Sequence, residues 1–157
     1  MEVEMRIFTK LAMLLVLALV ITGSCVSTPG DFSEARGKEW LLVEVKTQPQ
    51  NITFNRKTLK SDGYGNIFSL TFDGERLSGV AAPNRYTAPY TLEDNHGIKV
   101  NIIAGTMMAA LHEPEKLREH IYYTYLQNAY RWRISNNLLE LSTKNADGVD
   151  AVLIFSR

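Results

Sequence analysis

The sequence predicts an α+β fold: a single small domain in which a curved, mainly antiparallel β-sheet carries one principal helix packed on it. Two observations predict this class. Short apolar runs with alternating polar residues recur along the chain and are separated by turns such as Asp73-Gly74. One segment, from Pro114 to Gln127, instead has apolar residues spaced four apart. The 157 residues, 45% of them hydrophobic, suit one packed core and make a second improbable.

The first half of the domain is predicted to consist of strands joined by turns. Glu39 to Lys46 is rich in aromatic and β-branched residues, which predicts a largely buried strand. Asn51 to Asn55 predicts a short peripheral strand, and the polar, glycine-containing stretch from Arg56 to Asn66 predicts a loop. Ile67 to Phe72 and Arg76 to Val80 flank an Asp-Gly pair, so we expect an antiparallel hairpin there.

Proline shapes the connection that follows the hairpin. Ala81 to Tyr90 contains Pro83 and Pro89, so it cannot be a regular central strand throughout, and we expect a shaped connection with some extended structure. From Ile98 to Ala104 apolar and polar residues alternate again, which predicts another strand. Its apolar positions are Ile98, Val100 and Ile102.

The last third is predicted to be the helix followed by a three-stranded meander. Pro114 suits the first turn of a helix that continues to Gln127. The apolar stripe of this helix consists of Leu117, Ile121 and Tyr125. The strands are expected at Tyr130 to Ile134, Leu138 to Leu141 and Ala151 to Phe155, because the first two alternate and Asn- and Gly-containing turns separate all three.

The N-terminal segment has the pattern of a cleaved signal peptide. An uninterrupted apolar run from Leu11 to Ile21 follows Arg6 and Lys10. The run is about half of the roughly 20 residues that a membrane-spanning helix needs, so we expect residues 1–24 to be removed. Acidic residues ahead of the first basic one are atypical of such a leader, which suggests that translation begins at Met5.

Cys25 is the only cysteine, which excludes an intramolecular disulfide. The segment from Ile21 to Cys25 resembles a bacterial lipobox, although Thr22 replaces the usual leucine. We therefore expect Cys25 to carry lipid, because each buried methylene contributes about 0.8 kcal/mol to membrane binding. The alternative is a chance cysteine beside a secretory cleavage site. Residues 25–37 are predicted to be a flexible tether and 38–157 the folded domain.

Charge excludes one class of partner. Lysine plus arginine and aspartate plus glutamate both number 17, so the net charge is zero and nothing favours nucleic acid. The lipid on Cys25 must therefore supply membrane attachment. The predicted location is the outer membrane or the outer face of the cytoplasmic membrane, with the protein expected to be a monomer.

The sequence offers no recognisable catalytic or metal-binding set. His96, His112 and His120 lack the spacing of a zinc site, and Leu77-Ser78-Gly79 is no nucleophile elbow. Gly63-Tyr64-Gly65-Asn66 lacks the lysine and helix of a phosphate-binding loop. We therefore predict no catalytic residue, no metal and no cofactor.

Several segments together resemble the META or HslJ-like family of small bacterial domains over roughly residues 38–156. The segments are Trp40-Leu41-Leu42, Leu70-Thr71-Phe72 through Leu77-Ser78-Gly79, Asn84-Arg85-Tyr86 with Tyr90, Thr106-Met107-Met108-Ala109, Leu139-Glu140-Leu141 and Leu153-Ile154-Phe155. Pro83 and Ala110 stand where many members have cysteines, so a family disulfide is absent. The resemblance implies a stress-associated envelope protein without an established catalytic set. The stretch 48–65 looks longer than the family core.

The resemblance also suggests a ligand groove, because two of the family-like segments are expected to meet in space. Its candidate residues are Asn84, Arg85, Tyr86, Tyr90, Thr106 and Met107. The alternative, which we favour, is that Asn84 hydrogen-bonds irregular backbone while Tyr86, Tyr90 and Met107 fill the core. The aromatic residues after Glu119 are likewise expected to be mainly core, with some exposed for protein or glycan contact.

Three functions follow as hypotheses. The first is a non-enzymatic, lipid-anchored domain that binds another envelope component, a protein or a glycan, in stress tolerance. The second is an inhibitor or host-interaction lipoprotein that acts through exposed loops such as 48–65. The third is an unrecognised enzyme, which would need a pocket with converging titratable groups.

Overall fold

The computed structural model describes residues 30–108 and 116–157. The predicted signal peptide, Cys25 and the start of the predicted helix at Pro114 lie outside the described residues. The described elements, in chain order, are η1 (Phe32–Ala35), β1 (Glu39–Lys46), β2 (Ile52–Thr53), α2 (Arg56–Ser61), β3 (Ser69–Asp73), β4 (Arg76–Val80), β5 (Arg85–Glu93), β6 (Gly97–Val100), β7 (Ala104–Gly105), α3 (Glu119–Gln127), β8 (Arg131–Ser135), β9 (Leu138–Lys144) and β10 (Asp150–Ser156).

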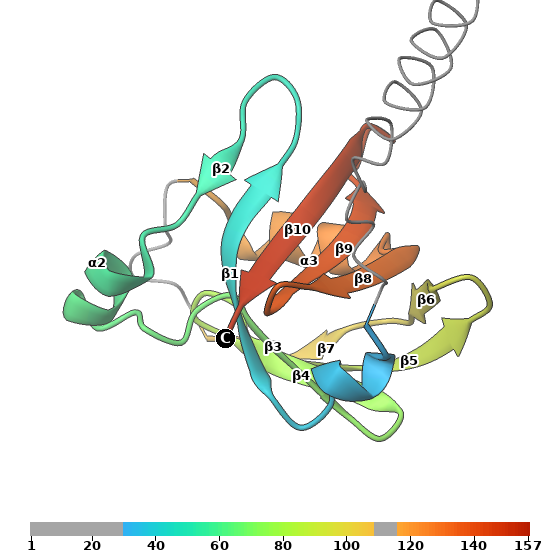
Figure 1. Cartoon of the computed structure of the whole chain (residues 1–157). Coiled ribbons are helices and arrows are strands. Elements are labelled where there is room, and N and C mark those ends of the chain that lie inside the picture. Colours follow the sequence, from blue (N-terminus) through green and yellow to red (C-terminus); the bar gives the residue numbers. More distant parts are fainter. Residues whose placement is uncertain (1–29, 109–115) are drawn as a thin grey trace, which may run out of the picture.

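The strands form one antiparallel sheet that closes on itself. Its order is β10-β9-β8-β6-β5-β4-β3-β1-β2, and β1 also pairs with β10, as Figure 1 shows. The junction of β6 with β8 is the narrowest, with Gly97 opposite Arg131 as its single ladder pair. The predicted class is confirmed: a single domain with a curved, mainly antiparallel sheet and one principal helix. The closure by β1 and β10 is a further feature that the sequence did not predict.

The core fills the inside of this curved sheet. Alternation buries Trp40 and Leu42 of β1, and after a register shift between Leu42 and Glu44 the strand buries Val45, while Glu39 and Lys46 are exposed. The same alternation buries Leu139 and Leu141 in β9. Residues from all the longer strands thus share one hydrophobic cluster, which is what a period-two pattern predicts for a sheet with one wet face.

Two small helical elements pack at opposite ends of β3 and β5. Phe32 of η1 lies 5.0 Å from Phe72 and 5.8 Å from Tyr90, measured between ring centroids. Tyr122 of α3 instead packs 5.1 Å from Phe68 and 5.9 Å from Tyr86, near the other ends of the same strands. The packing of Phe32 shows that the folded part begins before residue 38, so the predicted tether 25–37 extends too far into the domain.

The principal helix is shorter than predicted, and its buried face differs from the predicted stripe at Ile121. Residues 116–118 lie outside α3, which begins at Glu119. Its buried residues are Tyr122, Tyr125 and Leu126, whereas Ile121, placed by the sequence on the apolar stripe, is 38% exposed. Leu117 and Tyr125, the other two residues of the predicted stripe, are buried. The spacing-of-four pattern therefore found the helix and part of its buried face but not its start, and Tyr122 packs in the core through its ring despite its hydroxyl.

Two other segments differ from the prediction. The stretch from Arg56 was expected to be a loop, but Asn55 caps a short helix there by accepting hydrogen bonds from the backbone of Lys57 and Thr58. The strand predicted over Ile98 to Ala104 breaks into β6 and β7, and Ile102 is 82% exposed. The prediction of one strand with Ile102 among its apolar positions was therefore wrong at Ile102, which lies between the two strands.

Pro89 lies inside β5, where the sequence argued against a regular strand. The Pro89 carbonyl accepts a hydrogen bond from the Asn101 backbone nitrogen, at 2.9 Å. A strand residue's nitrogen points to the same side as its carbonyl, so the missing N–H of Pro89 faces the break between β6 and β7. No ladder bond is lost there, which is why the strand tolerates this proline.

Candidate functional site

Asn84 joins three segments that are distant in sequence. Its side-chain oxygen accepts hydrogen bonds from the Thr106 hydroxyl, at 2.8 Å, and from the Met108 backbone nitrogen, at 2.7 Å. Its side-chain nitrogen donates to the Met108 carbonyl and to the Glu119 carboxylate. The backbone nitrogen of Asn84 donates to the other oxygen of Glu119, at 3.0 Å. Asn84 is 5% exposed, so this buried amide has its hydrogen-bonding capacity used by protein.

The Asn84 contacts fix the geometry of the chain around Arg85. The backbone nitrogen of Arg85 donates to the Thr106 hydroxyl and the Thr106 nitrogen donates to the Arg85 carbonyl, at 3.2 and 3.0 Å. Glu119 stands in the first turn of α3, where a carboxylate also suits the positive end of the helix dipole. The two family-like segments do meet, as the sequence predicts, and they meet through backbone as well as side chains.

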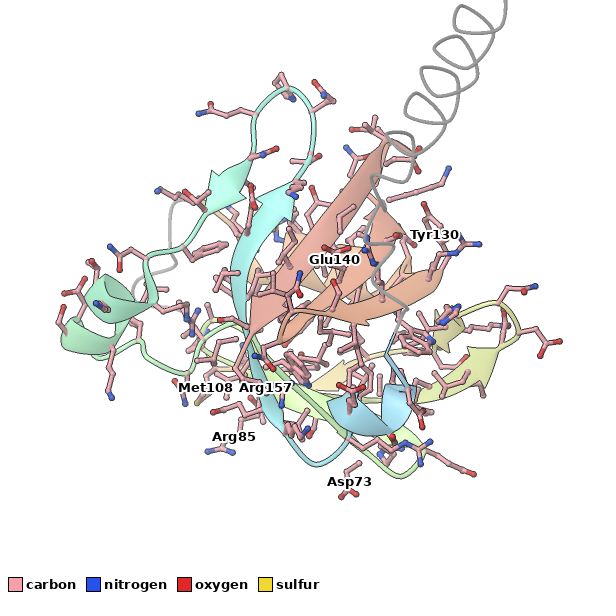
Figure 2. All side chains as sticks on the ribbon, viewed as in Figure 1. Asp73, Arg85, Met108, Tyr130, Glu140 and Arg157 are labelled. Carbon is pink, nitrogen blue, oxygen red and sulfur yellow. The ribbon has the colours of Figure 1, made fainter. Side chains whose placement is uncertain are left out.

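A hollow of about 280 Å³ opens beside this junction. It is lined by Gly63, Tyr64, Asn66, Ile67, Val80, Ala82, Pro83, Arg85 and Met108. We call this set the Arg85 hollow. Ile67 and Ala82 are buried, while Tyr64 and Met108 are 37% and 55% exposed, so the hollow has an apolar floor and a partly apolar rim. Arg85, labelled with Met108 in Figure 2, carries the only charge among these lining residues.

The far wall of the Arg85 hollow depends on a partly buried arginine. Arg56, the first residue of α2, donates hydrogen bonds from its guanidinium to the carbonyls of Leu42, Gly65 and Ile67. Burial lowers the pKa of Arg56 below its ordinary value, and nearby Tyr122 and Glu39 act in the opposite direction. These bonds hold the 63–67 segment against β1, so the stretch 48–65 is part of the hollow's frame.

A cluster of tyrosines lies behind the junction. The Tyr86 hydroxyl donates to the Ser69 carbonyl, at 2.7 Å, and lies 3.1 Å from the Tyr122 hydroxyl. Burial raises the pKa of Tyr86 well above its ordinary value, and it also raises the pKa of Tyr122. Burial, with a contribution from Glu119, raises the pKa of Tyr123 to about 12. These phenols therefore stay neutral near neutral pH and act as packing and hydrogen-bonding groups.

The predicted groove residues fall into three places. Arg85 lines the Arg85 hollow, while Asn84 and Thr106 support it from behind. Tyr86 is buried in the tyrosine cluster.

Tyr90 and Met107 lie elsewhere. The Tyr90 hydroxyl donates to the Gly74 carbonyl near the η1 end of β5. Met107 is 99% exposed, so it neither lines the hollow nor fills core. Sequence reasoning missed Tyr64 and Met108; the available signal was that each is an apolar residue inside a segment already singled out for other reasons.

Two further observations concern the described residues alone. Among residues 30–108 and 116–157, no group of three or more histidine, cysteine, aspartate or glutamate side chains could hold a metal ion. No helix in that part of the chain has the length and apolar character to cross a membrane.

Two solved structures have a similar fold. An NMR structure of a protein from Burkholderia xenovorans matches with a TM-score of 0.60 and 20% identity, covering 87% of this chain and 94% of that one. A crystal structure of a DUF4847 family protein from Bacteroides vulgatus matches with a TM-score of 0.53 and 14% identity, covering 81% and 96%. At these identities the likeness shows the fold alone.

No curated protein matches the chain. Residues 33–154 match the META domain, and they include nearly all of the described strands and all the residues that Asn84 joins. The chain belongs to the META domain family.

Proposed function

We propose that this protein is a lipid-anchored envelope protein whose META domain binds another envelope component, a protein or a glycan, in the Arg85 hollow. The carrying observation is the hollow itself: an apolar floor beside a single cationic side chain, held open by a buried hydrogen-bonded junction. The lipobox-like segment ending at Cys25 supports the anchorage, because acylation there would confine the domain to a membrane surface.

The chemistry of the hollow defines what it would recognise. The exposed parts of Tyr64 and Met108 offer apolar contact, and Arg85 offers hydrogen bonds and charge to a carboxylate or phosphate oxygen. The favoured occupant therefore presents an apolar group next to an anionic one. Among the described residues that line the hollow, Arg85 is the only ionisable side chain other than a tyrosine, so the proposal is for binding without chemistry.

The role of a host-interaction or inhibitor lipoprotein is a second candidate, and one observation favours it. Residues 63–67, at the end of the stretch that looks longer than the family core, supply one wall of the hollow. Deleting 48–65 would not separate the candidates, because Ile52, Phe54 and Leu59 pack on the core and Arg56 holds the wall. Point variants within the hollow are the suitable tool.

Photo-crosslinking in intact cells tests the binding site. A photoreactive amino acid replaces Tyr64, and the matched control replaces Val149, which is similarly exposed at 40% on the β9–β10 turn. We expect a discrete protein or glycan adduct from position 64 that Arg85→Glu and Met108→Asp abolish.

Identical adducts from both positions, or an adduct from position 64 that survives both substitutions, would contradict the proposal. An adduct partner from the same cell favours the envelope role. A partner supplied only by host material favours the second candidate.

A further inference from the structure

The first described residue, Gly30, contacts strand β8 of the closed sheet. The backbone nitrogen of Gly30 donates a hydrogen bond to the Ile134 carbonyl, at 3.0 Å. Phe32 then packs 5.0 Å from Trp132, ring centroid to ring centroid. These contacts fix the polypeptide to the folded domain from Gly30 onward.

Only a short length of chain separates that point from the proposed lipid. Four residues lie between Cys25 and Gly30. Five Cα-to-Cα steps span at most about 18 Å even when fully extended. If Cys25 is acylated, as the proposed function holds, the Gly30–Ile134 contact cannot lie farther than this from the lipid-bearing residue.

The surface beside this contact has the chemistry of a membrane-interface contact. Tyr130 is 48% exposed, and Arg131 and Arg133 point outward from the same face of β8. A hollow of about 300 Å³ lies there, lined by Asn95, His96, Arg131, Trp132 and Arg133. Tyrosine is favoured at membrane–water interfaces, because its ring is apolar and its hydroxyl can reach water. Arginine binds phosphate through paired hydrogen bonds.

This surface is not strongly basic. Arg133 lies 3.9 Å from the Glu140 carboxylate, and Glu93 and Asp94 precede the Asn95–His96 turn. A surface of mixed charge would bind a bilayer weakly without the anchor. With the anchor in place, the contact needs only to choose which side of the domain faces the headgroups.

The Arg85 hollow lies at the other end of the domain. Arg85 begins β5, whereas Tyr90, which contacts Phe32, lies five residues further along the same strand. Five residues of strand span about 16 Å, at roughly 3.3 Å per residue. Figure 2 shows Tyr130 and the pair Arg85 and Met108 on opposite sides of the molecule.

We propose that the β8 surface, defined as Tyr130, Arg131, Arg133 and the Asn95–His96 turn, lies against phospholipid headgroups, so that the Arg85 hollow opens away from the membrane. This inference rests on the proposed anchorage at Cys25. It adds an orientation, and it implies that the hollow receives a component presented from the aqueous side.

Headgroup quenching of single labels tests the orientation. The lipidated protein, in vesicles of phosphatidylethanolamine with phosphatidylglycerol, carries one fluorophore on an introduced cysteine, since Cys25 is the only native one and its sulfur would be blocked by the proposed diacylglyceryl group. Tyr130→Cys places the label on the β8 surface, and Lys60→Cys places it on exposed α2 beside the hollow. Quenchers attached to the headgroups are expected to reduce the fluorescence of the label at position 130 and to leave the fluorescence of the label at position 60 unchanged.

Charge reversal on the β8 surface provides a second test of the orientation. Arg131→Glu is expected to cut the quenching at position 130, whereas Lys57→Glu, an exposed residue of α2, leaves it unchanged. Equal quenching at positions 130 and 60 in vesicle-bound protein would overturn the orientation while the anchorage stands. Protein that does not sediment with vesicles and carries no lipid mass would overturn the anchorage itself.

Discussion

At the scale of single residues, the fold depends on a few buried polar side chains that hold irregular backbone. Asn84 connects the turn before β5 to Thr106, Met108 and Glu119. The favoured expectation that Asn84 hydrogen-bonds irregular backbone agrees with these contacts. Asn84 thus shapes the hollow from behind without being one of its lining residues.

Replacing Asn84 with alanine tests this supporting role. The substitution removes the side-chain donor to the Glu119 carboxylate, which keeps only the backbone nitrogen of residue 84, and it removes the side-chain partners of the Met108 nitrogen and carbonyl. We therefore expect the free energy of unfolding to fall by about 2–3 kcal/mol. Urea denaturation measures it. Arg85→Ala is the matched control, because that side chain is exposed and its loss is expected to change stability little. Equal stability of the two variants would contradict the assignment.

The tyrosine cluster gives a prediction for alkaline pH. An unfolded tyrosine loses its proton near pH 10, whereas burial keeps Tyr123 protonated to about pH 12. Its contribution to stability is therefore complete below about pH 10 and is lost as the pH rises from there through about 12. The pKa values of Tyr86 and Tyr122, also raised by burial, act in the same direction.

Tyr123→Phe isolates one member of the cluster. The Tyr123 hydroxyl is buried with no hydrogen-bond partner among the described residues, so its removal should cost little at neutral pH. We expect the variant to lose stability less steeply than the parent above about pH 10. Urea unfolding midpoints across this range provide the measurement, and parallel pH curves for both proteins would rule out the predicted contribution.

At the scale of elements, close approach between β4 and β3 depends on a glycine. A Cβ built on Gly79 would overlap the Ser69 carbonyl oxygen and lie 2.9 Å from the Tyr86 hydroxyl. The Ser69 carbonyl is the same atom that accepts hydrogen bonds from Tyr86 and Tyr122. Local packing at this point therefore couples the sheet to the tyrosine cluster and to α3.

Gly79→Ala is expected to lower the free energy of unfolding by about 1–3 kcal/mol or more, because backbone must shift to admit the methyl group. Gly65→Ala is the control, since its nearest neighbour would be the flexible side chain of Lys60 at 3.3 Å. Thermal or urea unfolding compares the two. A Gly79→Ala protein as stable as the Gly65→Ala protein would show that the strands are not so closely packed.

At the scale of the whole molecule, local patterns predicted most elements and no long-range closure. Aromatic and β-branched content identified β1, and alternation with turn residues identified β4 and the C-terminal meander, because these signals depend only on residues near in sequence. The pairing of β1 with β10 joins residues about 110 positions apart, and nothing local encodes it. The sequence did not predict the short helix α2, because none of its side chains is fully buried and it shows no apolar stripe.

The candidate site was predictable only in part, because it too depends on contacts between residues distant in sequence. Arg85 and Thr106 belong to segments that could be singled out along the sequence. The wall from Tyr64 to Ile67 is brought beside Arg85 by tertiary contacts, among them the hydrogen bonds of Arg56 to distant carbonyls. A hollow formed by tertiary contacts between such segments leaves no period or spacing in the chain that builds it.

The measurement that most directly tests the account is the intact mass and membrane partitioning of the natively expressed protein beside Cys25→Ala. The account predicts that the wild-type chain begins at Cys25, carries diacylglyceryl mass and sediments with membranes, whereas the variant is released into the soluble fraction. If both proteins are soluble and carry no lipid, the domain is a freely secreted one. The proposed anchorage and the orientation that rests on it would then both be wrong.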